Sequence, residues 1–192
     1  MRLGRTPTWT CSFAVLCALV STHVNAQSKS ETSLQVSAQQ LRETGSSDLD
    51  IKPGIGWEAQ IRQTYGRLSL GVGYQSTNLA RDKDILNFNA TVNTYFLEPR
   101  FVAYGADRAA LYLAGRVGYG KLKITCDDET ICGNDTDDRT TYGGGGGLLV
   151  KLTSSVAADL GAQWFQMTNV NIDGWIMYRL GVSIGFNTDT KR

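Results

Sequence analysis

The chain has 192 residues, 19 of them basic and 18 acidic, so its formal net charge at pH 7 is only +1. Such a balance provides no basic surface for nucleic acid, and we expect no nucleic-acid partner. The length suits one domain. After the N-terminal region, no segment offers the roughly 18 consecutive apolar residues that a membrane-spanning helix needs.

Residues 1–26 are predicted to be a secretory signal peptide that is removed. Arg2 and Arg5 give a basic start, the apolar run CSFAVLCALV follows, and cleavage is expected after Ala26. The remaining domain, residues 27–192, has lost those two arginines and therefore carries 17 basic and 18 acidic residues. It has also lost His23, the only histidine in the sequence.

Apolar and polar side chains alternate through most of the remaining chain, and a period of two indicates β-strands with one apolar face. Within 109–124, Leu111, Leu113 and Val117 share one face, while Arg116 lies on the other. The pattern predicts eight strands, at residues 33–41, 54–65, 68–75, 88–104, 109–124, 140–152, 156–167 and 174–187.

The connections between these strands alternate in length. Longer polar loops are expected at 42–53, 76–86, 125–138 and 168–173, and short turns at 66–67, 105–108 and 153–155. An even strand number with short periplasmic turns and longer extracellular loops is typical of bacterial outer-membrane barrels. We therefore predict an all-β fold, an eight-stranded antiparallel up-and-down transmembrane β-barrel, whose closure leaves no strand edge in the lipid.

The alternating hairpins, the segment Leu97–Phe101 (LEPRF) and a last strand that ends on Phe186 resemble the small outer-membrane β-barrel family of the OmpA and OmpX type. The resemblance covers residues 33–186. It implies a place in the bacterial outer membrane, contact with its lipid, and insertion by the barrel-assembly machinery, which reads a terminal aromatic residue. We expect a monomer that contributes to envelope integrity or to surface interaction through its extracellular loops, with an unidentified surface partner.

Charged side chains of the predicted strands fall on the face opposite the apolar one. On the lipid face, an arginine or lysine at the membrane midplane would cost about 2–4 kcal/mol. Eight strands enclose an interior just wide enough for side chains to fill. We expect a salt-bridged plug with Gln60 and Gln163 beside it and Lys151 as a further candidate. The alternative is a narrow ion path gated by the same pairs. The predicted charge network consists of Glu58, Arg62, Glu98, Arg100, Arg116, Asp159 and Arg179.

Two features of the strands have local interpretations. In 88–104, the apolar residues Val92 and Phe96 lie at even positions, whereas Leu97 and Phe101 lie at odd positions. The apolar side of the strand therefore changes between them, which predicts a β-bulge near 95–99. Aromatic residues at strand ends are expected at the membrane interfaces. These are Tyr65, Tyr104, Trp164, Trp175 and Phe186.

Cys126 and Cys132 bracket a short segment of the third long loop. In an oxidising compartment we expect a disulfide between them, the alternative being two free thiols. The same loop is rich in aspartate, so Ca²⁺ binding is an alternative to a solvated acidic loop. The spacing matches no known calcium loop, and we expect neither a metal site nor a cofactor.

Catalysis is not expected. Barrel hydrolases generally use a histidine as a base, and the mature chain has none. Besides the leading hypothesis, two alternatives remain open, namely a narrow porin-like channel and a secreted soluble lipocalin-like barrel. The last of these would need an apolar interior and a polar exterior.

Overall fold

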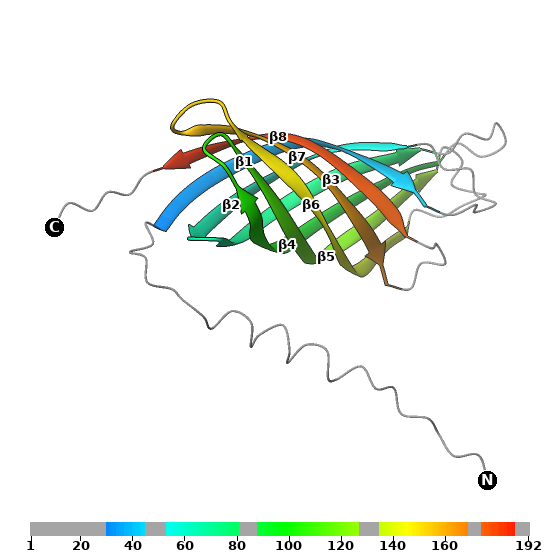
Figure 1. The fold of residues 1–192 in the computed structure, drawn as a ribbon. Coiled ribbons are helices and arrows are strands. Elements are labelled where there is room, and N and C mark those ends of the chain that lie inside the picture. Colours follow the sequence, from blue (N-terminus) through cyan, green and yellow to red (C-terminus); the bar gives the residue numbers. More distant parts are fainter. Residues whose placement is uncertain (1–29, 45–52, 81–87, 127–134, 169–173, 187–192) are drawn as a thin grey trace, which may run out of the picture.

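The computed structural model describes residues 30–44, 53–80, 88–126, 135–168 and 174–186. Eight antiparallel strands form a closed barrel in chain order, and β1 pairs with β8 to complete it (Figure 1). The predicted eight-stranded up-and-down all-β fold is confirmed. The strands are β1 (Ser30–Glu43), β2 (Gly54–Tyr65), β3 (Leu68–Ala80), β4 (Phe88–Gly105), β5 (Ala109–Cys126), β6 (Asp135–Lys151), β7 (Val156–Met167) and β8 (Trp175–Phe186).

Within these ranges, no helix has the length and apolar character needed to cross a membrane. The predicted signal peptide, residues 1–26, lies outside the described residues and stays a prediction.

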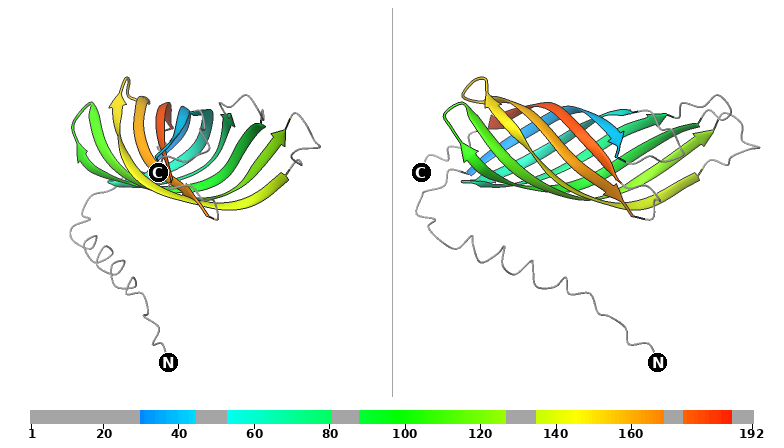
Figure 2. Two further views of the ribbon diagram at one scale, coloured as in Figure 1. Left: turned by 90° about the vertical axis from the view of Figure 1, so that its right-hand side faces the viewer. Right: turned by 45° about the vertical axis from the view of Figure 1, so that its right-hand side comes forward.

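The short connections lie at one end of the barrel, together with the start of β1 and the end of β8 (Figure 1). This turn end holds the β2–β3, β4–β5 and β6–β7 turns. In the first of them Gly66 has a φ of 59°, a left-handed conformation that glycine adopts without steric cost. The opposite end is called the loop end below. The strands run between the two ends at an incline to the barrel axis (Figure 2).

Several strands extend further toward the loop end than the sequence predicts. β3 continues to Ala80, and β6 begins at Asp135 where the pattern predicts a loop. The ladder persists there, with Asn78 opposite Thr91 and Lys121 opposite Asp138. Outward side chains in this region are polar, so hydrophobic alternation fades although the backbone pairing continues.

The predicted bulge near 95–99 is wrong. From Ala90 to Arg100, β4 alternates without interruption, and the even-numbered side chains point into the barrel. The shift in pairing with β5 lies instead between Val102 and Tyr104. Val92 and Phe96 are buried inside the barrel, so apolar residues on both faces do not require a change of register here.

An apolar cluster fills the barrel interior near the loop end, and we call it the apolar cap. It explains why Val92 points inward. Trp175 also belongs to it, with only 7% of its surface exposed, so the expectation that Trp175 lies at a membrane interface is wrong. The cap consists of Leu41, Leu79, Ala90, Val92, Phe165, Met167, Trp175 and Met177, with Leu122 packed against it.

The outer surface carries a row of aromatic side chains on neighbouring strands, all of them exposed except Tyr74, which is half-buried. Trp57 and Tyr74 have ring centroids 5.6 Å apart, and Tyr74 and Tyr95 are 5.1 Å apart. Tyr95 stands opposite Tyr119 in the ladder, and the row continues over β6 and β7. Among the other predicted interfacial residues, Tyr65, Tyr104, Trp164 and Phe186 are exposed on the outer surface. This aromatic row consists of Trp57, Tyr74, Tyr95, Tyr119, Tyr142 and Trp164.

Candidate functional site: the charged lumen

Alternation along five strands brings seven charged side chains to the middle of the lumen. The structure brings together all seven residues of the predicted charge network, and each has at most 5% of its surface exposed. They are Glu58 and Arg62 on β2, Glu98 and Arg100 on β4, Arg116 on β5, Asp159 on β7 and Arg179 on β8.

Glu98 is the centre of this network. Its Oε1 accepts hydrogen bonds from Arg62 Nη2 at 2.8 Å and from Arg100 Nε at 2.7 Å. Its Oε2 accepts from Arg116 Nε at 2.9 Å and from Arg179 Nη1 at 3.0 Å. One carboxylate therefore faces four guanidinium groups and ties β4 to β2, β5 and β8.

The other two carboxylates share the same arginines. Glu58 accepts from Arg116 Nη2 at 2.8 Å and from Arg179 Nη1 at 3.0 Å. Asp159 Oδ2 lies 3.0 Å from Arg100 Nη2 and 3.7 Å from Arg179 Nη2. Because every charge of the network except Arg62 pairs with more than one opposite charge, a change at one residue affects several pairs.

Tyr112 is a member of this site that the sequence did not single out. Its hydroxyl donates to Asp159 Oδ1 at 2.6 Å and accepts from Arg179 Nη2 at 2.8 Å. Its ring also lies under the Arg100 guanidinium, 4.4 Å from the ring centroid, a cation–π geometry. Tyr112 shares the inward parity of Arg116 on β5, and that parity is the signal that could have identified it.

Buried glutamines complete the hydrogen bonding. Gln35 donates to Asp159 Oδ2 at 2.6 Å and accepts from Arg100 Nη2 at 3.1 Å. Gln75 accepts from Arg116 Nη1 at 2.6 Å. Neither was predicted, whereas the expected neighbours Gln60 and Gln163 do contact the network, through Arg62 and Glu98 respectively.

The glycine run 143–147 supplies space for this packing. Gly147 stands opposite Tyr112 in the ladder, and a Cβ placed there would collide with the Tyr112 hydroxyl. At this position glycine makes room for a large inward neighbour.

The network contains four arginines and three carboxylates, so it carries an excess of one positive charge when all are ionised. Lys151 does not join it. This lysine lies at the turn end of β6, is exposed, and lines a cavity below the network. In the part of the chain that the structure describes, no carboxylate forms an ion pair with it.

The predicted disulfide lies partly outside the described residues. Cys126 ends β5, whereas Cys132 falls in the segment 127–134. The bridge therefore stays a prediction. Asp127, Asp128 and Glu129 of the acidic loop also lie outside the described residues, so the choice between a solvated loop and Ca²⁺ binding stays open. In the described ranges, no group of three or more histidine, cysteine or acidic side chains is arranged to hold a metal ion.

The sequence matches the outer membrane protein β-barrel domain family over residues 12–187. The chain belongs to this family. It is a protein of the bacterial outer membrane, as its strand pattern predicts. No curated protein matches it by sequence.

Solved structures with a similar fold are also outer-membrane barrels. Neisserial surface protein A is 14% identical with a TM-score of 0.60, covering 83% of this chain and 98% of that one. Ail of Yersinia pestis, in complex with the heparin analogue sucrose octasulfate, is 16% identical with a TM-score of 0.55, covering 84% and 100%. A major outer membrane protein of Thermus thermophilus is 12% identical with a TM-score of 0.51, covering 82% and 99%.

Family membership orients the barrel and identifies its lipid-facing surface. In such proteins the short turns are periplasmic, so the loop end faces outward from the cell. On β2, Trp57 and Tyr65 are eight residues apart, or ~26 Å along the strand. At the roughly 40° tilt of such barrels this spans about 20 Å along the barrel axis, which lies within their ~25 Å apolar band. Outward side chains between them include Ile61, which is exposed. An apolar exterior and a charged interior are the reverse of a soluble lipocalin-like barrel, and that alternative has no support.

Proposed function

We propose that this protein is a non-enzymatic outer-membrane barrel with a closed lumen, which acts through the part that projects beyond the lipid. It contributes to surface interaction, to envelope integrity, or to both. The observation that carries this proposal is the central position of Glu98, which is fully buried and bonded to arginines from β2, β4, β5 and β8.

Closure of the lumen is supported at two levels. The charge network occupies the middle of the barrel, and the apolar cap fills the section nearer the loop end. An ion crossing this barrel would have to displace paired charges and then pass a tightly packed section in which apolar side chains predominate, beside a few buried polar ones such as Gln39 and Thr77. Either step is unfavourable, because ions are poorly solvated in apolar surroundings.

The surface role is supported by the strands that continue beyond the aromatic row. On the outer face of β4 and β5, apolar residues give way to Thr91, Asn93, Lys121 and Lys123. A polar sheet surface above the lipid is suited to contacts with other molecules. The fold is also shared with Ail, whose name denotes attachment and whose structure holds a sulfated heparin analogue.

Planar-bilayer recording tests the closed lumen. The wild-type barrel is expected to give no steady conductance. Glu98→Gln, which removes the central carboxylate at almost unchanged volume, is expected to give at most brief openings, because the apolar cap remains. Steady wild-type conductance would contradict the closed barrel.

Deletion and complementation test the surface role. Loss of the gene is expected to reduce adhesion to host matrix or to raise sensitivity to bulky antibiotics. Complementation with Lys121→Glu/Lys123→Glu should restore barrier function but not adhesion, and Lys151→Glu at the opposite end is the matched control. A deletion strain that keeps both properties would contradict the proposal.

A narrow channel is the second candidate, favoured by one observation. A cavity of about 190 Å³ reaches from the turn end to Arg62, Arg100 and Tyr112, so the periplasmic part of the lumen is already open. In the described part of the chain, the network, the cap and the buried polar side chains next to them then separate the two sides. A wild-type conductance that rises in a Leu41→Ala variant of the cap would favour this channel over the closed barrel.

A further inference from the structure

The turn end of the lumen contains a small chamber that neither a closed plug nor a surface role requires. It has a volume of about 190 Å³ and is lined by residues from all eight strands and the β6–β7 turn. Family membership places its mouth on the periplasmic side. We call this chamber the vestibule.

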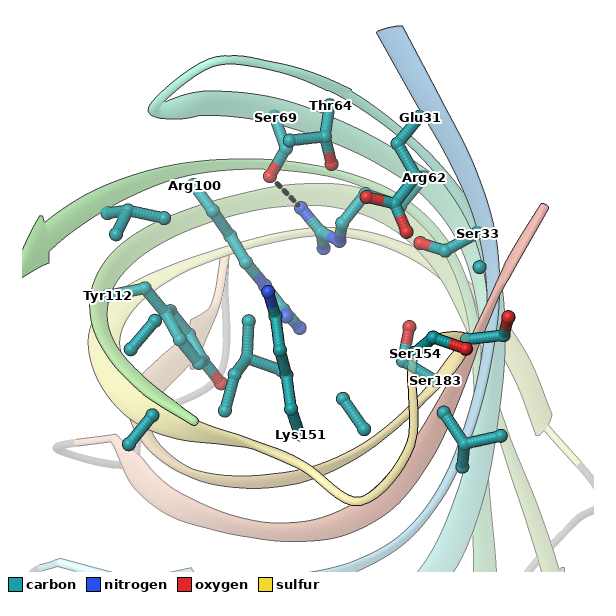
Figure 3. A pocket seen from close by; sticks show the side chains of 18 of the residues that line it. Glu31, Ser33, Arg62, Thr64, Ser69, Arg100, Tyr112, Lys151, Ser154 and Ser183 are labelled. Atoms are coloured by element: carbon teal, nitrogen blue, oxygen red, sulfur yellow. Dashed lines mark hydrogen bonds between the residues drawn. The ribbon is translucent and has the colours of Figure 1, made fainter. Parts of the chain in front are cut away.

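The charged groups of the vestibule are unequal in sign. Arg62, Arg100 and Lys151 extend into it from three sides, and among the described residues of its lining Glu31 is the only acidic one (Figure 3). Hydroxyl groups of serine and threonine from β1, β2, β3, β8 and the β6–β7 turn supply neutral donors around them. The lining therefore combines cations with hydroxyl donors, the groups that bind oxyanions in proteins.

The arginines are not fully neutralised by the network behind them. Glu98 is shared among four guanidinium groups, which leaves the seven-residue network with one excess positive charge. Arg62 is only 5% exposed, yet its Nε has no hydrogen-bond partner. In the described part of the chain Lys151 also lacks an ion-pair partner, so the vestibule has unmet capacity for an anion.

The size of the vestibule limits what can enter. At 190 Å³ it is smaller than the roughly 300–1,000 Å³ of pockets for drug-sized ligands. It holds the volume of about six water molecules at ~30 Å³ each. A tetrahedral oxyanion with part of its hydration shell fits this space.

We propose that the vestibule binds a small oxyanion of the phosphate or sulfate type, presented from the periplasmic side. Arg62 and Lys151 hold the charge, and the surrounding hydroxyl groups donate to the remaining oxygen atoms. The anion is either a free ion or the phosphate of a lipid headgroup in the periplasmic leaflet. This site does not depend on whether the barrel conducts or adheres.

Calorimetric titration of the full chain in a non-ionic detergent tests the site. Inorganic phosphate is added at constant ionic strength, with chloride as the compensating anion. The expected result is saturable binding at one site, weakened about fivefold by Lys151→Gln, since a partly exposed charge contributes up to ~1 kcal/mol. Glu31→Gln, which removes the opposing carboxylate, is expected to strengthen binding.

Lys123→Gln is the matched control, because it removes one exposed lysine from the outer face of β5, away from the vestibule. Each variant is checked for folding by its heat-dependent mobility in SDS gels. Absence of saturable heat, or equal weakening by Lys151→Gln and Lys123→Gln, would overturn the site. A change in the same direction for Glu31→Gln and Lys151→Gln would overturn the electrostatic basis.

A second titration separates the two sources of the anion. Dihexanoyl-phosphatidylglycerol, used below its critical micelle concentration, carries the same phosphate on a lipid headgroup. Tighter binding than inorganic phosphate supports the headgroup, and binding of inorganic phosphate alone supports a free ion. If neither binds, the proposal is wrong.

Discussion

The middle of the lumen and its loop end are filled in two different ways. In the middle, carboxylates and guanidinium groups meet at defined atoms, and Glu98 alone connects four strands. At the loop end, Leu41, Val92 and Phe165 pack through apolar side chains that form no directional bonds. The first arrangement depends on partners and register, whereas the second depends on volume.

This difference predicts different responses to mutation. A buried ion pair that loses one partner leaves an uncompensated charge, which is strongly destabilising. An apolar cluster that loses atoms is left with a cavity, and a side chain of similar volume can replace the original at little cost. Loss of any single charge in the network is therefore expected to destabilise the barrel strongly. In the cap, replacement by an apolar side chain of different shape but similar volume is expected to cost little.

Glu98→Gln is expected to have the largest effect. It removes the only negative charge shared by four buried arginines, and breaking a buried pair costs about 3–5 kcal/mol. The free energy of unfolding is measured by urea titration of the barrel in detergent, followed by tryptophan fluorescence.

Glu58→Gln sharpens this measurement. Glu58 is as buried as Glu98 but pairs only with Arg116 and Arg179, so its loss is expected to cost less. If Glu58→Gln and Glu98→Gln lowered the free energy of unfolding equally, the number of arginine partners would not determine how much each carboxylate stabilises the barrel.

The charged half of the lumen could be predicted from the sequence for two reasons that agree. The alternation of side chains places the charged residues on one face of each strand, and the free-energy cost of a charge in lipid requires that face to be the inner one. Charged residues at alternate positions cannot face lipid, so Glu58, Glu98 and Arg116 had to lie inside. Which arginine meets which carboxylate could not be predicted. That depends on the stagger between strands, which brings Arg179 of β8 to Glu98 of β4.

The apolar half could not be predicted, because an apolar side chain suits both lipid and a barrel interior. Val92 and Phe96 were therefore interpreted as a register change, and Trp175 as an interfacial residue. Parity alone would have placed Trp175 correctly, since it shares the face of Met177 and Arg179. As an aromatic residue at a strand end, it was expected at a membrane interface, but it packs inside the barrel as part of the cap.

In the cap, truncation of Leu41 to alanine is expected to lower the free energy of unfolding by about 2–5 kcal/mol, the range for large-to-small changes in cores. Leu41 is almost fully buried among the cap residues. The same urea titration measures the loss. Leu34→Ala on the same strand is the control, because Leu34 faces outward and leaves no internal cavity.

Tyr112→Phe tests a neutral member of the charge network, on the side that faces the turn end. It keeps the ring under Arg100 but removes the hydroxyl that bridges Asp159 and Arg179. Hydrogen bonds to charged groups contribute about 1.5–3 kcal/mol, so a loss in this range is expected in the urea titration. A loss below that of an outward change, such as Tyr95→Phe, would show that the bridge does not stabilise the network.

Leu41→Met is expected to have the smallest effect, below about 1.5 kcal/mol, because it conserves volume and polarity in the cap. The corresponding conservative change in the network is Glu98→Asp, which keeps the charge but shortens the side chain by one methylene group. Since Glu98 reaches arginines on three other strands, a shorter carboxylate cannot keep all of its bonds. If the cap depends on volume and the network on atomic position, urea titration will show Glu98→Asp to be clearly more destabilising than Leu41→Met. The opposite order would mean that the lumen is held by shape throughout, and that its charges merely occupy the space.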